Sequence, residues 1–131
     1  NPADMDSRKE RPETAPRLRI RIVFGDRGMI GPGKAELLDR IGQTGSIAAA
    51  GREMGMSYKR AWMLIETLNA MFHAPLVEST RGGPGGGGAV LTETGRMVLD
   101  HYRAFEAEAS GAGAAHLDAL SALLGDIPHE K

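Results

Sequence analysis

Apolar and polar residues alternate with a period of two near the start of the chain, within residues 17–24. One set of positions holds Leu18, Ile20, Ile22 and Phe24, and the other holds Arg17, Arg19, Arg21 and Val23. This alternation predicts a half-buried strand, because successive side chains of a strand point to opposite faces. The turn residues at 25–28 predict that 29–30 return as a short second strand. The arginine face fits either a solvated surface or contact with phosphate.

Helical periodicity appears first in residues 34–43, where leucine and isoleucine recur every three or four positions. A Gly-Pro-Gly turn precedes this helix, and the glycines within 42–45 are predicted to end it. The same spacing returns in residues 93–108, behind Thr92 or Thr94 as the N-cap. The apolar face of this last long helix consists of Met97, Val98, His101, Tyr102 and Phe105.

Residues 46–72 predict two helices that are separated by a tight turn. Ser46 is a suitable N-cap for the short run IAAAGREM, Gly55 provides the positive φ of the turn, and Ser57 caps the second helix. The apolar stripe of the second helix consists of Ala61, Leu64, Ile65, Leu68 and Phe72. The small side chains that suit a close crossing of the two helices are Ala49, Ala50 and Gly51.

Two β-prone runs, 76–80 and 89–92, flank a glycine-rich segment at 82–88, and this arrangement predicts a hairpin. Residues 83–88 also match the pattern G-x-G-x-x-G. In a dinucleotide-binding protein that pattern opens a helix, whereas here a β-prone run follows it. A Walker loop is excluded as well, because no Lys-Ser or Lys-Thr pair follows. The glycine segment is therefore interpreted as a hairpin tip.

These elements predict a mainly α fold with a small β component, a winged helix-turn-helix that begins with a strand or hairpin. The predicted domain covers residues 17–108. The charged and proline-containing residues 1–16 are predicted to be disordered. Residues 109–131 are predicted to form an acidic C-terminal tail, in which a weaker apolar stretch indicates a short helix.

Charge is distributed unevenly along the 131 residues, whose formal net charge is −1. Residues 14–104 contain 12 Lys or Arg and 8 Asp or Glu, whereas residues 105–131 contain one Lys and five acidic residues. The middle of the chain is therefore mildly basic, which suits phosphate binding. The sequence has no cysteine, no apolar run near the roughly 20 residues of a membrane span, and no signal peptide at its N-terminus. We therefore expect a cytoplasmic protein without a membrane association.

The start of the second helix carries the candidate DNA-binding residues. In a helix-turn-helix this end enters the major groove and must present polar side chains. Ser57 is the cap, Tyr58 is placed to stack on DNA or to bond phosphate, and Lys59 and Arg60 are placed to meet guanine edges or phosphates. Any pair of helices in a bundle has a similar pattern, so the DNA-binding interpretation needs a second feature. The predicted hairpin supplies it.

A wing is a hairpin whose tip lies on the DNA backbone or in the minor groove. Thr80 and Arg81 precede the glycine tip and offer polar and cationic contacts. The bare glycine N–H groups offer close approach to phosphate, which compensates for the entropy that so many glycines lose on ordering. The alternative is a loop without a partner.

Other chemistry finds little support in the sequence. The four histidines lack the spacing of metal ligands, and no nucleophile–base pair is recognisable, so we expect neither an enzyme nor a cofactor. Trp62 lies beside the apolar stripe of the second helix and is predicted to be a core anchor rather than a base-stacking residue.

The motifs TGSIAAAGREMGMSYKRAW, PLVE and RGGPGGGGAVLTETG, in this order within residues 18–106, resemble the N-terminal DNA-binding domain of molybdate-dependent, ModE-type regulators, which are related to the LysR-type winged helix. The resemblance implies a homodimer that binds double-stranded DNA and pairs through the helices 34–43 and 93–108. The DNA contacts that it implies are Ser46, Ser57, Tyr58, Lys59, Arg60, Thr80, Arg81, Gly82, Gly83, Gly85, Gly86, Gly87 and Gly88.

Full-length members of that family carry C-terminal oxyanion-binding domains, and these 131 residues contain no counterpart of them. We therefore expect either a stand-alone DNA-binding form without the molybdate-binding domains or a DNA-binding domain cut from a longer protein. A molybdate or other oxyanion effector is left open. A second hypothesis is a winged helix that binds another protein instead of DNA, since a fold does not determine its function. Binding to duplex DNA that weakens as salt rises discriminates between the two hypotheses.

Overall fold

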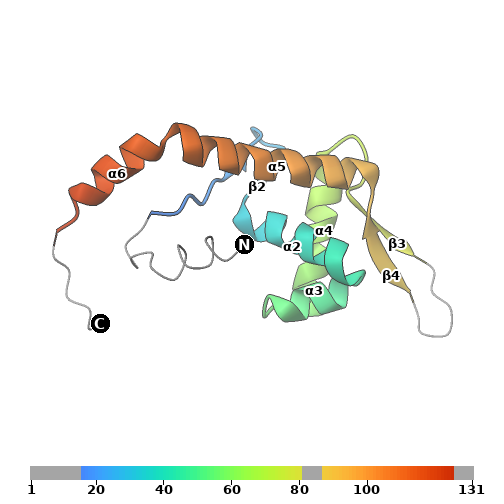
Figure 1. The fold of residues 1–131 in the computed structure, drawn as a ribbon. Coiled ribbons are helices and arrows are strands. Elements are labelled where there is room, and N and C mark those ends of the chain that lie inside the picture. Colours follow the sequence, from blue (N-terminus) through green and yellow to red (C-terminus); the bar gives the residue numbers. More distant parts are fainter. Residues whose placement is uncertain (1–15, 81–86, 126–131) are drawn as a thin grey trace. The chain divides into compact units, whose positions relative to one another are not determined.

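The computed structural model describes residues 16–80 and 87–125 of the chain. Within them, helices dominate and the strands form two separate two-stranded antiparallel sheets, as predicted for a mainly α protein with a small β component. Figure 1 shows the fold coloured along the sequence. In chain order, the elements are β1 (Ile22–Val23), β2 (Met29–Ile30), α2 (Pro32–Thr44), α3 (Ile47–Glu53), α4 (Tyr58–Met71), β3 (Val77–Thr80), β4 (Gly88–Leu91), α5 (Glu93–Ala112) and α6 (Ala114–Ala122).

The chain divides into two compact units, of which the larger covers residues 19–106. The core of this unit lies where α2, α3 and α4 pack together and meet both hairpins. Tyr102 is the one buried side chain with a polar group among the described residues, and none of the charged ones is buried. Apolar burial is thus the main stabilising contribution to this domain. The largest side chains that are fully removed from solvent are Leu37, Leu38, Ile41, Ile65, Leu68 and Leu76.

The strand predicted over residues 17–24 is shorter than expected, because only Ile22 and Val23 form a ladder with β2. The reason is that β2 has two residues before the chain turns into α2 at Pro32. The predicted alternation of exposure holds for residues 17–22, whose arginines are exposed and whose aliphatic side chains are half-buried. Phe24 departs from it and is 41% exposed, with its ring edge against Phe72.

Helix α2 begins at Pro32, earlier than predicted, because proline suits the first helical position, where no intrahelical N–H bond is needed. It runs through Gly42 and ends at Gly45, whose φ of 71° is left-handed. The caps of the next two helices are confirmed. The hydroxyl of Ser46 accepts the Ala49 N–H, and that of Ser57 accepts the Arg60 N–H.

Helix α5 is capped by Thr92, whose hydroxyl accepts the Gly95 N–H at 2.9 Å and donates to the Pro75 carbonyl at 2.6 Å. The helix continues to residue 112, past the predicted end at 108, because a single serine and glycine lower helix stability without stopping a helix. Of its predicted apolar face, Tyr102 is buried, whereas Met97 and Phe105 are 52% and 50% exposed.

Among the described residues, the smaller unit contains 16–18 and 107–125, including α6. None of the α6 residues is buried. The leucines at 120, 123 and 124 are exposed.

Candidate nucleic-acid interface

Helices α3 and α4 form a compact helix-turn-helix. Gly55 in the turn has a φ of 74°, as predicted for this position. The two helices approach each other closely at Gly51, where an added Cβ would lie 3.1 Å from the Ala61 Cβ. Ala50 and Ala61 are both fully buried at this contact, so small side chains set the distance between the helices.

The N-terminal end of α4 is exposed. Tyr58 is 55% exposed, and Lys59 and Arg60 are exposed beside it. Within the part of the chain that the structure describes, neither cation forms an ion pair. This end of the helix therefore presents two positive charges and a phenol to solvent.

Two other cations of the domain, Arg40 and Arg103, form ion pairs. Arg40 on α2 contacts Glu36 at 2.7 Å and Glu53 of α3 at 2.9 Å. Its hydrogen bonds with Glu53 and Glu36 raise the pKa of the Arg40 guanidinium above its usual range. Arg103 on α5 contacts the carboxylates of Glu36, Asp39 and Glu106. The pairing of these two arginines contrasts with Lys59 and Arg60, which have no ion pair with any described residue.

The β3–β4 hairpin is fixed against the helices from two sides. On one side, the Ala89 N–H donates to the Gly45 carbonyl at 2.9 Å, which joins β4 to the end of α2. Gly88 passes so close to that turn that an added Cβ would lie 2.6 Å from the same carbonyl oxygen. On the other side, the Asn69 side chain of α4 accepts the Leu76 N–H at 2.8 Å and donates to the Val77 carbonyl at 3.2 Å. The hairpin therefore has a defined position relative to α4.

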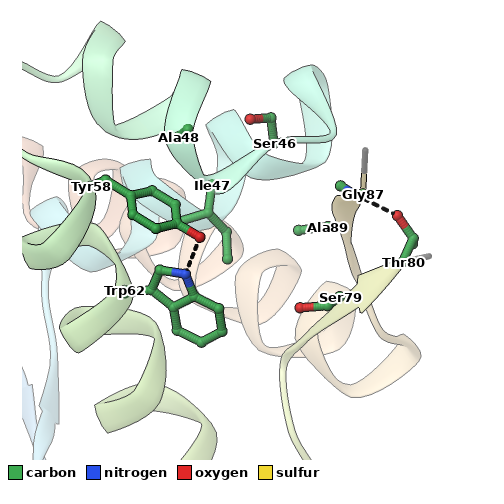
Figure 2. A pocket seen from close by; sticks show the side chains of 10 residues that line it. Ser46, Ile47, Ala48, Tyr58, Trp62, Ser79, Thr80, Gly87 and Ala89 are labelled. Atoms are coloured by element: carbon green, nitrogen blue, oxygen red, sulfur yellow. Dashed lines mark hydrogen bonds between the residues drawn. The ribbon is translucent and has the colours of Figure 1, made fainter. Parts of the chain in front are cut away.

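A groove of about 280 Å³ separates α4 from the hairpin. Figure 2 shows Tyr58 and Trp62 on one side of it and Thr80 and Ser79 on the other. Thr80 pairs with Gly88 across the hairpin, and its hydroxyl accepts the Gly88 N–H at 3.0 Å. The described residues that line the groove are Ser46, Ile47, Ala48, Tyr58, Trp62, Ser79, Thr80, Gly87, Gly88 and Ala89.

Trp62 has two environments, so its prediction as a core anchor is only partly right. It packs against the core, but it is half-buried and its indole lines the groove. Its indole N–H donates to the Tyr58 hydroxyl, and the two rings meet edge to face with centroids 6.4 Å apart. The sequence contained a signal for this pairing, since residues four apart on a helix lie on one face.

The structure brings five of the candidate residues together at the groove, namely Ser46, Tyr58, Thr80, Gly87 and Gly88. Three more lie at the start of α4 but do not line it, namely Ser57, Lys59 and Arg60. Five lie outside the described residues, namely Arg81, Gly82, Gly83, Gly85 and Gly86. Sequence reasoning missed Trp62 and Ser79 as groove residues.

Residues 16–80 and 87–125 contain neither a metal-binding cluster nor a helix that could cross a membrane. No group of three or more His, Asp or Glu side chains is placed to hold a metal ion there. None of the helices in this part of the chain has the length and apolarity that crossing a membrane requires.

A capped helix pair with a left-handed glycine turn, followed by a hairpin fixed beside the second helix, defines a winged helix-turn-helix domain. Residues 33–96 match the family described as "Bacterial regulatory helix-turn-helix protein, lysR family". This part of the chain is a helix-turn-helix domain of the ModE type, as the relatives below indicate.

The chain is 47% identical over 78 residues to the molybdenum-pterin-binding protein MopB of Rhodobacter capsulatus. The matched stretch covers 60% of this chain and 29% of MopB. It is 40% identical over 94 residues to the molybdenum transport protein ModE of Azotobacter vinelandii, covering 72% of this chain and 33% of that protein. For the DNA-binding transcriptional dual regulator ModE of Escherichia coli K12, identity is 42% over 71 residues, 54% of this chain and 27% of that protein. The chain thus spans about a third or less of the length of these relatives.

Proposed function

We propose that this chain is a transcriptional regulator that binds double-stranded DNA through the domain predicted over residues 17–108. The observation that carries the proposal is the exposed start of α4, where Lys59 and Arg60 stand without ion pairs among the described residues. In a winged helix-turn-helix, this is the end that enters the major groove. The similarity to a DNA-binding regulator of Escherichia coli supports the same function. Because bacterial DNA lies in the cytoplasm, we place the function there.

In this proposal, α4 reads base edges and the hairpin lies on the neighbouring backbone or in the minor groove. Ser57 holds the first turn of α4 in place, and Lys59 and Arg60 contact guanine edges or phosphates. The hairpin is rigidly joined to α2 and α4, so it reaches the DNA in a fixed relation to the reading helix. We extend the contact to the wing tip, residues 81–86, on the resemblance alone.

We further propose that the protein binds DNA as a homodimer through α5. Met97 and Phe105 lie two helical turns apart on this helix and are half exposed, which is unfavourable for a monomer in water. The apolar side of α2 is buried in the domain's own core, so α5 is the better candidate for the dimer contact. A dimer would read two half-sites about 34 Å apart or a multiple of that distance. Sedimentation equilibrium of wild type and of a Met97→Glu, Phe105→Glu variant tests this, since the double variant should be monomeric.

The DNA-binding proposal is tested by fluorescence anisotropy with a labelled duplex that the protein itself selects from a randomised pool. We expect the affinity to fall steeply between about 50 and 200 mM salt. Lys59→Ala and Arg60→Ala should each weaken binding by about tenfold and leave the melting temperature unchanged, because both side chains are exposed. Arg27→Ala is the matched control, an exposed arginine in the β1–β2 turn.

Selection of no duplex at low salt would contradict the proposal and favour the hypothesis of a protein-binding winged helix. Equal affinities for wild type, Lys59→Ala and Arg60→Ala would contradict the placement of α4 as the reading helix.

A further inference from the structure

Four hydroxyl groups line the groove between α4 and the hairpin, those of Ser46, Tyr58, Ser79 and Thr80. Three of them accept a hydrogen bond from inside the protein. The Ser46 Oγ accepts the Ala49 N–H at 3.0 Å, and the Thr80 Oγ1 accepts the Gly88 N–H at 3.0 Å. The Tyr58 hydroxyl accepts the indole N–H of Trp62. None of the three donates its own proton to another described residue.

The direction of these hydrogen bonds is fixed by their partners. A backbone N–H and an indole N–H have no acceptor function, so the hydroxyl oxygen must accept in all three bonds. Each hydroxyl then keeps its proton for a partner in the groove. A hydroxyl that already accepts a hydrogen bond is also a better donor, because such bonds polarise one another. The groove thus presents oriented O–H donors, and no described residue that lines it carries a charge.

We infer that this groove holds a phosphate of the DNA backbone through neutral hydroxyl donors, and that Trp62 is the positioning residue for Tyr58. The inference rests on the proposed DNA binding. The sugar-phosphate backbone is the ridge between the major and the minor groove. A protein that places α4 in the major groove and the hairpin on the adjoining backbone or minor groove must therefore receive that ridge between them. Phosphate oxygens are acceptors without donor function, which matches a groove that offers O–H protons.

The inference separates two kinds of contact by their response to salt. A cation that neutralises a phosphate releases condensed counterions, and its removal lowers the slope of log affinity against log salt by about 0.9. A neutral hydroxyl releases none. Loss of a groove hydroxyl should therefore weaken binding by a constant factor at every salt concentration, whereas loss of Lys59 should change the slope.

The test uses the full chain and the self-selected duplex, with Tyr58→Phe, Trp62→Phe and the double variant. Tyr58→Phe should weaken binding about tenfold at an unchanged slope, since hydrogen bonds to charged groups are worth about this much. Trp62→Phe should weaken binding severalfold while Tyr58 is present and should have no further effect in the Tyr58→Phe background. Thr80→Val should resemble Tyr58→Phe.

Thr67→Val is the matched control, because it also removes one exposed hydroxyl from α4. The Thr67 hydroxyl donates its proton to the Met63 carbonyl at 3.0 Å, so it has none for DNA. We expect the DNA affinity of the Thr67→Val protein to equal that of wild type. The melting temperature of every variant is recorded, so that a loss of fold is distinguished from a loss of contact.

The DNA partner is identified with duplexes that carry one methylphosphonate at a time. At one position the effect of Tyr58→Phe should disappear, because the phosphate that receives the hydroxyl has lost its charge. If the effect disappears instead when a purine is replaced by its 7-deaza analogue, the hydroxyl contacts a base and the phosphate assignment is wrong.

Tyr58→Phe with wild-type affinity, or equal effects of Trp62→Phe in both backgrounds, would overturn the inference while wild-type binding still supports the proposed function. Failure of the wild type to bind any duplex would overturn both.

Discussion

Replacing Gly95 by alanine is the sharpest test of how the hairpin is joined to α5. Gly95 lies in the first turn of α5 and is buried against the start of β3. A Cβ added there would lie 2.1 Å from the Leu76 carbonyl oxygen and 2.9 Å from its carbonyl carbon. Both atoms belong to the backbone, so no side-chain rotation relieves the overlap.

The cost follows from what must move. To reach an ordinary contact of 3.4 Å, the helix and the Leu76 carbonyl must separate by about 1.3 Å. That carbonyl accepts the Thr92 N–H at 2.9 Å, and the Thr92 hydroxyl donates to the Pro75 carbonyl, so the movement weakens both bonds. Overpacking costs about 1–3 kcal/mol and a lost hydrogen bond about 1 kcal/mol, against a gain of about 1 kcal/mol in helix propensity. The net destabilisation expected is about 1–3 kcal/mol.

Urea unfolding followed by circular dichroism measures this change, and a thermal scan should show a melting temperature lower by about 10 °C. Gly111→Ala is the matched control, since it makes the same substitution in α5 where an added Cβ meets nothing within 4 Å. It should leave stability unchanged or raise it by less than about 1 kcal/mol. A Gly95→Ala protein within about 0.5 kcal/mol of wild type would refute the close approach of α5 to the Leu76 backbone.

Three further results are expected. Gly88→Ala should lower DNA affinity severalfold and stability by about 1–3 kcal/mol, because the added Cβ would displace β4 from the Gly45 carbonyl. Anisotropy measures the affinity, and urea unfolding measures the stability. Asn69→Ala should destabilise by about 2 kcal/mol in urea, because the hydrogen bonds that join α4 to β3 are lost, whereas Asn69→Asp should keep the acceptor and part of the stability. Burial raises the pKa of Tyr102 above 10.0, so the folded state holds this proton more tightly and stability should fall as the pH rises past about 10. Tyr102→Phe should remove this loss of stability at alkaline pH. At neutral pH it should destabilise the protein by about 1 kcal/mol, because the hydrogen bond from the Tyr102 hydroxyl to the Ile20 carbonyl is lost. Unfolding curves at pH 7 and 10.5 would show both effects.

The helix-turn-helix was predictable because its signals are local. A capping serine forms its bond within three residues of its own position, as Ser46 and Ser57 do. The glycine at the turn is likewise determined by the φ that the turn requires. These features depend on neighbouring residues alone, so a single sequence is sufficient to place them.

The errors concern features that depend on distant segments. The length of the first strand is set by its partner, and β2 has two residues to offer. The environment of Trp62 is set by where the hairpin lies, which periodicity along α4 does not reveal. The bonds from Asn69 to the backbone of residues 76–77 have no signal in the sequence, because a polar residue at that position of a helix is equally compatible with solvent exposure.

The central claim is that the exposed start of α4 binds DNA phosphates or guanine edges by charge. It is tested most directly by the salt dependence of duplex affinity for wild type and for a Lys59→Ala, Arg60→Ala double variant. If both residues neutralise phosphates, the slope of log affinity against log salt should be smaller for the variant by about 1.8. Equal affinities of the two proteins at every salt concentration, or a wild-type affinity that does not respond to salt, would contradict the claim.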